Sequence, residues 1–495
     1  MEDNVERPFP PGEYDVVVVG SGPGGLQTSH VLSTLGVRHA VLSQDDAPGG
    51  MFRRFPIFER LISWTKPDAP VERTTREYEQ YDHNSLTSDH DEARALVPAV
   101  MDRTYDVPAR SEMEAGLTAF AERGPVPVRY GCRWTGTRRD EEGFVLETSD
   151  GDYRCRFAVF AVGVTEPWIP SIAGAELAAH YVHTRPPDGY RDRRVVIIGK
   201  RNSGFEVGNG LLPWAKELVL VSPRPVKIDV LPQSPLRLRY LQPYEEYVRG
   251  GAGTYVVDAA ITGIERANGA LRVVAEGTER PGRLEFHADD VILATGFKAP
   301  LQDLRELGVA TVLNDRVPAL SPFFESLSVR GIFFAGNASS GAKGMRKHGT
   351  APNSTSVNGF RYNARVLAEH LADRLGVERP RRRLSPAELV PFLLAELCRA
   401  PELWIQKNFL ARVVSLSNGD ARDDGILPLE HFLDAGGEDA VAAAIELDPR
   451  AVIHPTLYVR RHGRVTEYEL PPHPVHAFEG AEYRRELDEI VRLLV

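Results

Sequence analysis

Cysteine is scarce in this sequence. Among 495 residues there are three cysteines, Cys132, Cys155 and Cys398, which lie far apart and form no C-x-x-C pair. The spacing therefore indicates neither a disulfide framework nor a cysteine-based zinc site, and no H-E-x-x-H sequence indicates a metal site of another kind. We expect three reduced thiols in a cytoplasmic protein.

Long apolar runs and an excess of basic residues are lacking as well. No stretch approaches the ~20 apolar residues that a membrane span needs. Residues 1–6 have neither the basic nor the hydrophobic part of a signal peptide. The 59 Lys and Arg residues are outnumbered by 69 Asp and Glu residues, which gives a net charge of −10. We therefore expect neither a membrane nor a nucleic acid as a partner.

What the sequence does contain is an internal repeat. A near-continuous apolar strand over 14–19 leads into a glycine-rich turn, a helix and a strand over 37–42, and the same order recurs from a strand over 194–198 to one over 218–221. Alternating, strand-like segments follow each unit, over 126–130, 144–148 and 152–157 in the first and over 254–264, 271–275 and 283–287 in the second. The repeat predicts an α/β fold with two Rossmann-like, doubly wound dinucleotide-binding domains.

The first repeat carries a surplus over about residues 46–110. Its aromatic content, which includes Trp64, Tyr78, Tyr81 and Tyr105, is too high for simple disorder. Because insertions of this size are usually functional or disordered, we interpret the segment as a wall of the active site.

The first glycine-rich turn has the G-x-G-x-x-G spacing of a dinucleotide site. Gly20 makes the tight turn, Gly22 lets the backbone approach a pyrophosphate, and Gly25 packs the following helix against the strand. Gly24 lies within the same turn. The helix N-terminus would supply N–H groups and a positive dipole to the phosphates.

An acidic residue is expected at the end of the next strand, where it would hold a ribose hydroxyl. This sequence has Ser43 there, followed by Gln44 and Asp45. We assign the ribose contact to one of these three residues, because a hydroxyl or an amide can also hold a ribose.

The second turn runs Gly199-Lys200-Arg201-Asn202-Ser203-Gly204, with Arg201 in place of the second glycine. A side chain there would obstruct the pyrophosphate unless Arg201 itself binds phosphate. Gly199, Arg201, Asn202 and Ser203 are the candidate binding residues of this turn. Nucleotide binding in an altered manner and a vestigial site both remain open.

The segment 331–337 is a buried strand that ends in Gly336-Asn337. It resembles the G-[DN] turn with which two-dinucleotide-binding flavoproteins hold the FAD phosphate and ribityl chain. The resemblance implies that the first glycine turn binds FAD and the second a pyridine nucleotide. Ser222 and Arg224, at the end of the strand over 218–221, favour NADPH because a hydroxyl and a guanidinium suit its 2′-phosphate.

The whole chain resembles class B flavin monooxygenases, and within them the FAD-dependent oxidoreductase domain-containing branch. The resemblance rests on short stretches that are specific as a set: GGMFRRFP at 49–56, LISWTK at 61–66, YDHNSL at 81–86, GFRY at 359–362 and HPTL at 454–457. It implies that Gly50 and Phe52 contact the cofactor.

The same resemblance makes Thr65, Lys66, Asn84 and His348 the candidate catalytic residues. Thr65 stands where class B enzymes have an asparagine that faces the flavin. The monooxygenase fingerprint is also incomplete, since residues 177–183 lack its first aromatic residue and its glycine. The likeness therefore supports the use of flavin and pyridine nucleotide better than it supports oxygenation.

Four segments follow from these patterns. We expect an FAD-binding domain over 14–170 and 299–376, an NAD(P)H-binding domain over 185–298 inserted within it, and a mixed C-terminal extension over 384–495.

The leading expectation for function is an NADPH-dependent FAD monooxygenase that acts on a small polar substrate, with N-hydroxylation of an amine or amino acid favoured. Reduced flavin would trap molecular oxygen as a C4a-peroxyflavin and transfer one oxygen atom. The alternatives are an FAD-dependent NAD(P)H oxidoreductase or oxidase without oxygen insertion, and a flavin-binding protein with a vestigial NADPH site. Assembly into a homo-oligomer stays open.

Overall fold

The computed structural model describes residues 7–55, 59–226, 244, 251, 253–342, 344, 347, 352–417 and 420–492. The chain forms two compact units. The first consists of Met1–Arg53, Ser63–Val164 and Ala299–Val495, and the second of Arg54–Ile62 and Thr165–Lys298. Among the described helices, none is both long and apolar enough to cross a membrane.

The first unit contains a sheet whose strand order is β2-β1-β5-β4-β3, with β17 beside β5. The strands are β1 (Gly12–Val19), β2 (His39–Leu42), β3 (Trp134–Arg139), β4 (Phe144–Thr148), β5 (Gly151–Phe160) and β17 (Ile332–Phe334). β1, β2, β5 and β17 run parallel, whereas β3 and β4 are antiparallel. The apolar run 16–19 is buried, as expected of a parallel strand that is covered on both faces.

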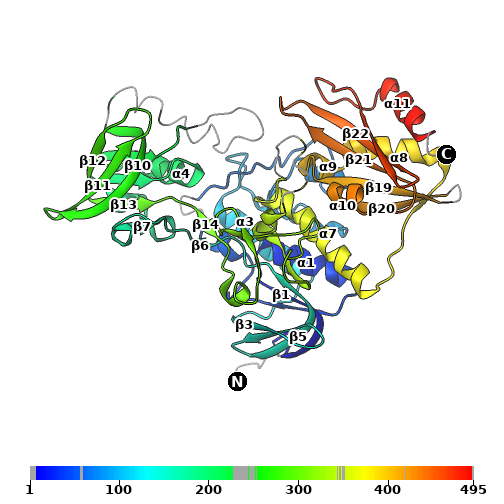
Figure 1. Cartoon of the computed structure of the whole chain (residues 1–495), viewed down its shortest axis with the longest axis horizontal. Coiled ribbons are helices and arrows are strands. Elements are labelled where there is room, and N and C mark those ends of the chain that lie inside the picture. The colour runs from blue at the N-terminus through cyan, green and yellow to red at the C-terminus, as the bar shows by residue number, and fades with distance from the viewer. Residues whose placement is uncertain are drawn as a thin grey trace. The chain divides into compact units, whose positions relative to one another are not determined.

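Two helices of the first unit pack together beside this sheet, α1 (Pro23–Thr34) and α7 (Val357–Leu375) (Figure 1). α1 ends before Gly36, whose φ of +70° is the left-handed conformation that terminates many helices. The α/β class predicted from the sequence is confirmed. The strand expected over 126–130 is wrong: a single bridge joins Arg129 to Leu42, because Pro127 has no N–H for a ladder.

The surplus segment of the first repeat folds into short helices and irregular chain. Its elements are η1 (Gly50–Arg53), η2 (Arg76–Gln80), η3 (Asp91–Ala93) and α2 (Leu96–Val100), and α3 (Arg110–Arg123) follows it. The segment 302–318 supplies further small elements of this unit, η7 (Gln302–Leu304), β15 (Thr311–Val312) and β16 (Val317–Pro318).

The second unit contains a seven-stranded sheet with the order β12-β11-β10-β9-β8-β13-β7. Its strands are β7 (Ala179–His180), β8 (Arg194–Ile198), β9 (Glu217–Ser222), β10 (Thr254–Ala267), β11 (Ala270–Gly277), β12 (Arg283–Ala288) and β13 (Asp290–Leu293). The five strands from β10 to β7 are parallel, and β11 and β12 form an antiparallel extension.

The helix of the second repeat, α4 (Asn202–Leu211), is shorter than expected. The helical pattern of the sequence reaches Trp214, but Pro213 has no N–H to donate to a carbonyl one turn earlier, and α4 ends at Leu211 although Leu212 still has helical dihedral angles. The other elements of this unit are β6 (Glu166–Pro167), η4 (Ala175–Leu177), η5 (Tyr181–His183), η6 (Pro187–Tyr190) and β14 (Phe297–Lys298).

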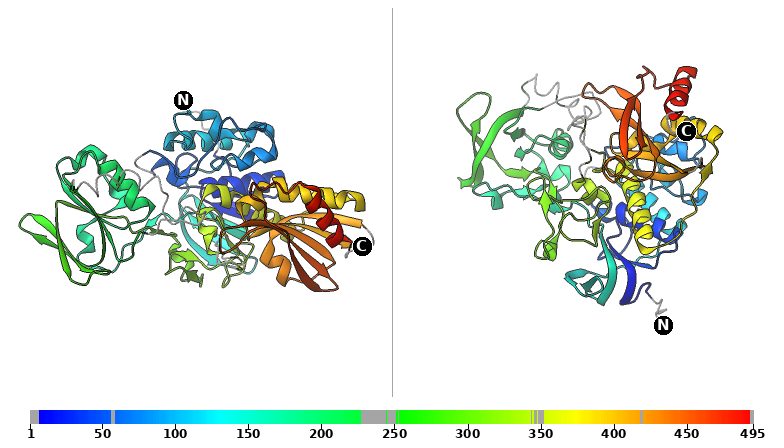
Figure 2. Two further views of the ribbon diagram at one scale, coloured as in Figure 1. Left: turned by 90° about the horizontal axis from the view of Figure 1, so that it is seen from above. Right: turned by 45° about the vertical axis from the view of Figure 1, so that its right-hand side comes forward.

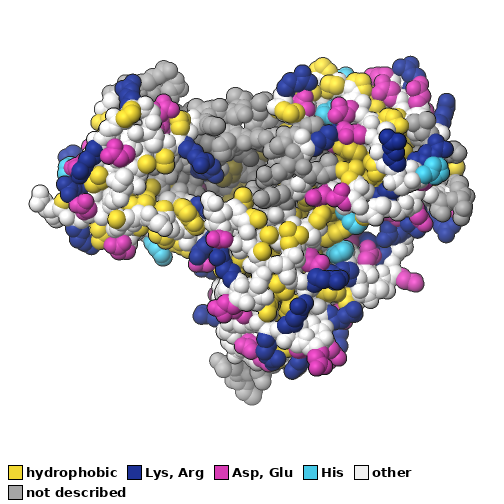
Figure 3. All heavy atoms as spheres, viewed as in Figure 1, with side chains coloured by type: hydrophobic (Ala, Val, Ile, Leu, Met, Phe, Trp, Pro, Cys, Tyr) yellow, Lys and Arg dark blue, Asp and Glu magenta, His cyan; other side chains and the backbone are white. Residues whose placement is uncertain are grey.

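The C-terminal extension is a six-stranded antiparallel sheet within the first unit, with the order β18-β20-β19-β21-β22-β23. Its elements are β18 (Arg383–Leu384), α8 (Pro386–Arg399), α9 (Pro401–Ile405), β19 (Leu410–Ser417), β20 (Asp420–Pro428), α10 (Leu429–Asp434), β21 (Ala440–Leu447), β22 (Ile453–Arg461), β23 (Arg464–Glu469) and α11 (Ala481–Val491). α8, α9 and α11 share an apolar core with one face of the sheet, and α10 packs on the other (Figures 1 and 2). Basic and acidic side chains lie interspersed on the face drawn in Figure 3.

Arg76 ties the surplus segment to this extension. Its guanidinium lies 2.7 Å from a carboxylate oxygen of Glu396 on α8 and 2.7 Å from one of Glu402 on α9. Burial would raise the pKa of Glu402, but the charge and hydrogen bonds of Arg76, together with the charge of Arg365, outweigh burial and lower that pKa. Both carboxylates are buried, so neither has water to replace the arginine.

We expect Arg76→Met to lower the free energy of unfolding by about 2–4 kcal/mol, because it removes the ion-pair partner of buried Glu402, whereas Glu396 keeps Arg412 at 3.6 Å. Thermal unfolding followed by circular dichroism measures the effect. Arg383→Met is the control: its ion pair with Asp420 is exposed on both sides, and we expect a change below ~0.5 kcal/mol. Equal midpoints for the two variants would contradict an anchoring role of Arg76.

Candidate functional site

The first glycine turn joins β1 to α1 in a conformation that needs glycine at both ends. Gly20 has a φ of +116°, and a Cβ atom there would lie 2.5 Å from the carbonyl oxygen of Ala161 at the end of β5. A Cβ atom on Gly25 would lie 1.9 Å from the carbonyl oxygen of Gly20. The turn therefore packs backbone against backbone, as the sequence pattern predicts.

Two segments that are distant in the sequence pack against this turn. A Cβ atom on Gly24 would lie 2.4 Å from both Cα and N of Gly336, the first residue of η8 (Gly336–Gly341). Gly50 has a φ of +55°, and its Cβ would lie 3.1 Å from Cα of Gly22. Asn337 follows Gly336 and is half-buried. The structure thus brings the four glycines of the first turn together with Gly50, Gly336 and Asn337, all of them predicted cofactor residues.

The centre of this arrangement is open toward the N-terminus of α1. Gly22 is the N-cap residue, no side chain caps the helix, and a Cβ atom on Gly22 would meet nothing within 4 Å. The first backbone N–H groups of a helix lack intrahelical acceptors and attract anions. These residues fit a dinucleotide pyrophosphate.

The predicted ribose residues lie at the end of β2. Ser43 is buried, and its Oγ lies 2.8 Å from Oγ of Ser21 and accepts a hydrogen bond from the backbone N–H of Asp45 (3.2 Å). Gln44 is exposed and Asp45 half-buried. Phe52, in η1, is also half-buried. The Ser43 hydroxyl therefore shapes the end of the strand, whereas the side chain of Gln44 faces solvent.

Thr65 and Asn84, two of the predicted catalytic residues, meet around Asp82. Thr65 is fully buried; its hydroxyl donates to Oδ1 of Asp82 (2.8 Å) and accepts from Nδ2 of Asn84 (2.9 Å). The backbone N–H of Asn84 donates to the same Asp82 oxygen (3.0 Å). The Thr65 hydroxyl is thus engaged within the protein. Lys66 is exposed, and His348 lies outside the described residues.

Arg361, on α7, is a residue whose role the sequence analysis missed. It is fully buried, and its guanidinium donates to the backbone carbonyls of Asp82 (2.8 Å), Ser85 (2.7 Å) and Glu79 (2.9 Å). The neighbouring Tyr362 hydroxyl donates to a carboxylate oxygen of Glu79 (2.8 Å). The sequence feature that could have indicated this role is an arginine among apolar positions of a helix, within the GFRY stretch.

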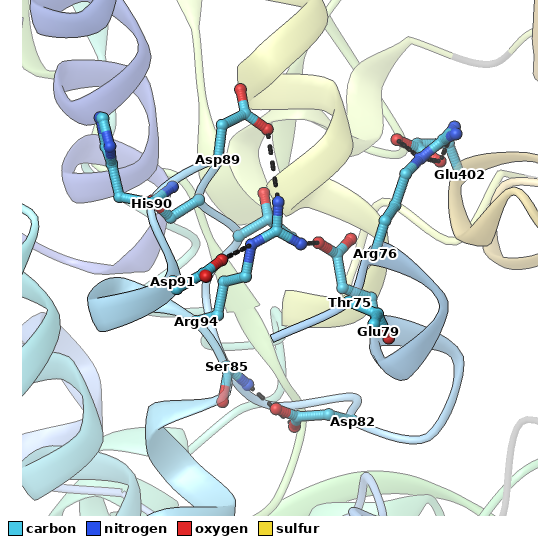
Figure 4. Close-up of polar contacts among 12 residues, drawn as sticks. Thr75, Arg76, Glu79, Asp82, Ser85, Asp89, His90, Asp91, Arg94 and Glu402 are labelled. Atoms are coloured by element: carbon cyan, nitrogen blue, oxygen red, sulfur yellow. Dashed lines mark hydrogen bonds and ion pairs between the residues drawn. The ribbon is translucent and has the colours of Figure 1, made fainter. Parts of the chain in front are cut away.

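A set of acidic residues surrounds Arg94 in the same segment (Figure 4). Its guanidinium lies 4.0 Å from Glu79, 3.8 Å from Asp89 and 3.9 Å from Asp91. Burial raises the pKa of Glu79, although the Arg361 charge opposes the shift. Arg94 thus pairs by charge with three carboxylates, while its Nε and Nη1 atoms have no hydrogen-bond partner among the described residues.

The second glycine turn repeats the geometry of the first. Gly199 has a φ of +130°, and its Cβ would lie 2.3 Å from the carbonyl oxygen of Ala294. A Cβ atom on Gly204 would lie 2.1 Å from the carbonyl oxygen of Gly199. Gly199 and Gly204 thus occupy the places that Gly20 and Gly25 have in the first unit.

Arg201 occupies the place of Gly22, as the N-cap residue of α4. Its φ of −112° and ψ of −168° are extended backbone that any residue adopts, as are the −73° and 176° of Gly22. No side chain caps α4, and Arg201 is exposed. Asn202 and Ser203 open the helix and are half-buried. The turn therefore fits a nucleotide phosphate, with a guanidinium at the helix N-terminus.

Lys200 adds a buried cation that the sequence analysis did not consider. Its Nζ forms an ion pair with Asp258 on β10 and donates to the carbonyl of Val257 (2.8 Å). Asp258 pairs in register with Ser222, the last residue of β9, while Arg224 is exposed two residues farther along. The predicted NADPH residues Ser222 and Arg224 thus lie at the carboxyl end of the parallel strands.

The three cysteines are all free thiols. Cys132 and Cys155 are buried and Cys398 is half-buried. Burial raises the pKa of Cys155 to about 12 and that of Cys398 to about 11, and it raises that of Cys132 as well. These thiols are protonated near neutral pH, whereas the reactive form of a cysteine is the thiolate.

A protein-family model for pyridine nucleotide-disulphide oxidoreductases matches residues 17–336, which include both glycine turns and Gly336. The chain belongs to this family. FAD and NAD(P)H are the cofactors of this oxidoreductase, and the two turns fit the two nucleotides.

Curated relatives are distant. The chain is 28% identical over 222 residues to FAD-dependent oxidoreductase domain-containing protein 2 of Danio rerio, covering 43% of this chain and 31% of that protein. It is 24% identical over 452 residues to the Mus musculus protein of the same name, covering 81% and 64%. The chain therefore spans less than two thirds of either relative. A ferredoxin–NADP reductase of Granulibacter bethesdensis is 25% identical over 66% of this chain and 81% of its own length.

Solved structures share the fold at low identity. A bacillithiol disulfide reductase from Staphylococcus aureus superposes with a TM-score of 0.56 and 15% identity, over 73% of this chain and 99% of its own. An ornithine N-hydroxylase from Kutzneria has a TM-score of 0.56 and 16% identity, over 74% and 100%.

The free space beside Gly22 and the close packing of Gly24 against Gly336 predict different effects for alanine at the two positions. We expect Gly22→Ala to fold normally and to bind FAD at least about tenfold more weakly, because its methyl group enters the space of the pyrophosphate. Gly24→Ala should lose stability as well, since its Cβ collides with Gly336 backbone. Flavin absorbance after gel filtration and the unfolding midpoint without added FAD separate the two effects. Unchanged FAD affinity of folded Gly22→Ala would contradict this assignment of the site.

Proposed function

We propose that the chain is an NADPH-dependent FAD monooxygenase that acts on a small polar substrate, in which the first glycine turn holds FAD and the second NADPH. The observation that carries the proposal is the matched geometry of the two turns, each with its first glycine against an alanine carbonyl and an uncapped helix beyond it. When bound, FAD would accept a hydride from NADPH and deliver the electrons to oxygen.

In this proposal the first unit orients FAD by backbone contacts. The N-terminus of α1 takes the pyrophosphate where Gly22 leaves room, and Gly336 and Asn337 hold the phosphate and ribityl side across from Gly24. Ser43, Gln44 and Asp45 are the ribose candidates. The engagement of Ser43 with Ser21 favours the two residues that follow it.

NADPH would be held by charge at the second turn. Arg201 places a guanidinium at the N-terminus of α4, where the helix dipole also favours an anion. Ser222 and Arg224 suit a 2′-phosphate, and a guanidinium can bind phosphate with two parallel hydrogen bonds. The exposed position of Arg201 supports its role as a phosphate ligand over that of an obstruction.

The state of the thiols argues against a dithiol reductase. A dithiol reductase needs two cysteines that react together, whereas the three cysteines here are free and their pKa values are raised. Amines and amino acids are the proposed substrates, in line with the resemblance to class B flavin monooxygenases.

An NAD(P)H oxidase that inserts no oxygen is the second candidate, and Thr65 favours it. Thr65 stands where class B enzymes have an asparagine, and its hydroxyl is engaged with Asp82 and Asn84. A side chain in such a buried arrangement is not free to contact a cofactor unless the arrangement opens.

We expect Arg201→Gly to raise the KM for NADPH about tenfold, because it removes a charged phosphate ligand. Steady-state NADPH oxidation measures the effect, and Arg191→Gly, an exposed arginine of the same unit, is the control. A lower KM in Arg201→Gly would instead identify Arg201 as an obstruction. Arg224→Ala should narrow the preference for NADPH over NADH.

The ratio of hydrogen peroxide formed to NADPH consumed decides between the two candidates. With L-ornithine, L-lysine and simple diamines as probes, a monooxygenase should show a peroxide yield well below the NADPH consumed and an N-hydroxylated product by mass spectrometry. Peroxide equal to NADPH with every probe would support the oxidase. A protein that binds FAD but oxidises no NADPH would overturn both.

A further inference from the structure

A cavity of about 410 Å³ lies within the first unit, and the residues that line it do not include those of the first glycine turn. Its walls come from the C-terminal half of α7, from β19 and β20, and from α10 and the residues after it. Small-molecule sites usually have volumes of about 300–1,000 Å³. His370, which lines the cavity, is roughly 18 Å along α7 from Asn358, near the end that faces η8.

Arg460, on β22, is a buried charge on the cavity wall. Only 7% of the residue is exposed, and no carboxylate of the described residues lies within 4.0 Å of it. Its guanidinium donates to the backbone carbonyls of Phe432 and Glu438 (3.5 Å to the latter) and lies 4.2 Å from the centre of the Phe432 ring. Within the described chain, Nε has no hydrogen-bond partner. Burying a charge without a counter-ion is costly, so the site is suited to an anion.

The other arginines of the wall are neutralised. Arg379 lies 2.9 Å from Glu369 and 2.7 Å from Asp373, and Arg381 lies 2.8 Å from Asp424. Arg422 lies 2.9 Å from the same aspartate. The four arginines of the wall are matched in number by its four carboxylates, and among the described residues Arg460 is the arginine that has no ion pair with any of them.

Aromatic and aliphatic groups make up much of the remaining wall. Phe323 stacks on His370 at 4.1 Å and meets His431 edge-on at 4.7 Å. Burial and the nearby Arg374 lower the pKa of His370 to about 4, and burial together with Arg460 lowers that of His431. Both histidines are therefore neutral near pH 7 and contribute ring surface instead of charge. Val413, Ile426 and Leu427 add apolar surface.

We propose that this cavity binds a small carboxylic acid with an apolar or aromatic body, whose carboxylate pairs with Arg460 and whose body lies against Phe323 and the aliphatic wall. A guanidinium and a carboxylate match as two parallel hydrogen bonds, and the charge then gains the partner that the protein does not supply. The site is separate from both glycine turns and does not depend on which acceptor takes the electrons.

Calorimetric titration of the full-length FAD-loaded protein with benzoate tests the proposal. Benzamide, which has the same ring without the charge, and inorganic phosphate, which has the charge without the ring, are the reference probes. We expect saturable binding of benzoate and at least about tenfold weaker binding of both others. Equal binding of benzamide would remove the role of the charge, and equal binding of phosphate that of the apolar body. No binding of benzoate at millimolar concentration would overturn the site.

Two variants locate the binding. Arg460→Met should reduce benzoate affinity at least about tenfold, whereas Arg422→Met, which removes a paired arginine of the same wall, should leave affinity within about twofold. Ala435→Phe projects a ring into the cavity from an exposed position and keeps Arg460, so it should also weaken binding if Arg460→Met fails to fold. Benzoate should raise the unfolding midpoint of the unaltered protein. Unchanged affinity in folded Arg460→Met, or in Ala435→Phe, would place the binding elsewhere.

Discussion

The contact between Gly24 and Gly336 is the constraint on which the flavin part of the molecule depends. It joins the first turn of α1 to the turn after β17, and a single methyl group on Gly24 would lie 2.4 Å from backbone atoms. Because β17 also pairs with β5, and β5 with β1, this approach fixes where the two turns meet. The open space beside Gly22 lies next to this contact, within the arrangement that the three strands fix.

Two arginines, the buried Arg361 and the half-buried Arg76, hold the rest of the first unit to this arrangement. Arg361 binds three carbonyls of the surplus segment from α7, and Arg76 binds carboxylates of α8 and α9 from within that segment. Both use charge-assisted hydrogen bonds, which are stronger than neutral ones and directional. These hydrogen bonds therefore connect the surplus segment to α7 and to the C-terminal extension. Thr65, Asp82 and Asn84 lie inside it, which explains why they are immobilised by one another.

Arg201 and Arg460, which form no ion pair among the described residues, lie in different surroundings. At the second turn, Arg201 is exposed, so water solvates its charge. In the cavity, Arg460 is buried, and within the described part of the chain it contacts two backbone carbonyls and the Phe432 ring. The charge of an arginine is thus solvated by water in one setting and shielded from water in the other.

The sequence by itself determined the α/β class, the repeat and both glycine turns, because a continuous apolar run and glycine spacing are local properties of the chain. It failed over 126–130, where Pro127 breaks the ladder, and it described the C-terminal sheet only as a mixed extension. Only the tertiary structure decided the roles of Thr65, Arg361, Lys200 and Arg460. The reason is physical: their hydrogen-bond partners and their burial come from segments far away in the chain, and no local pattern records which distant carbonyl or carboxylate will face a given side chain.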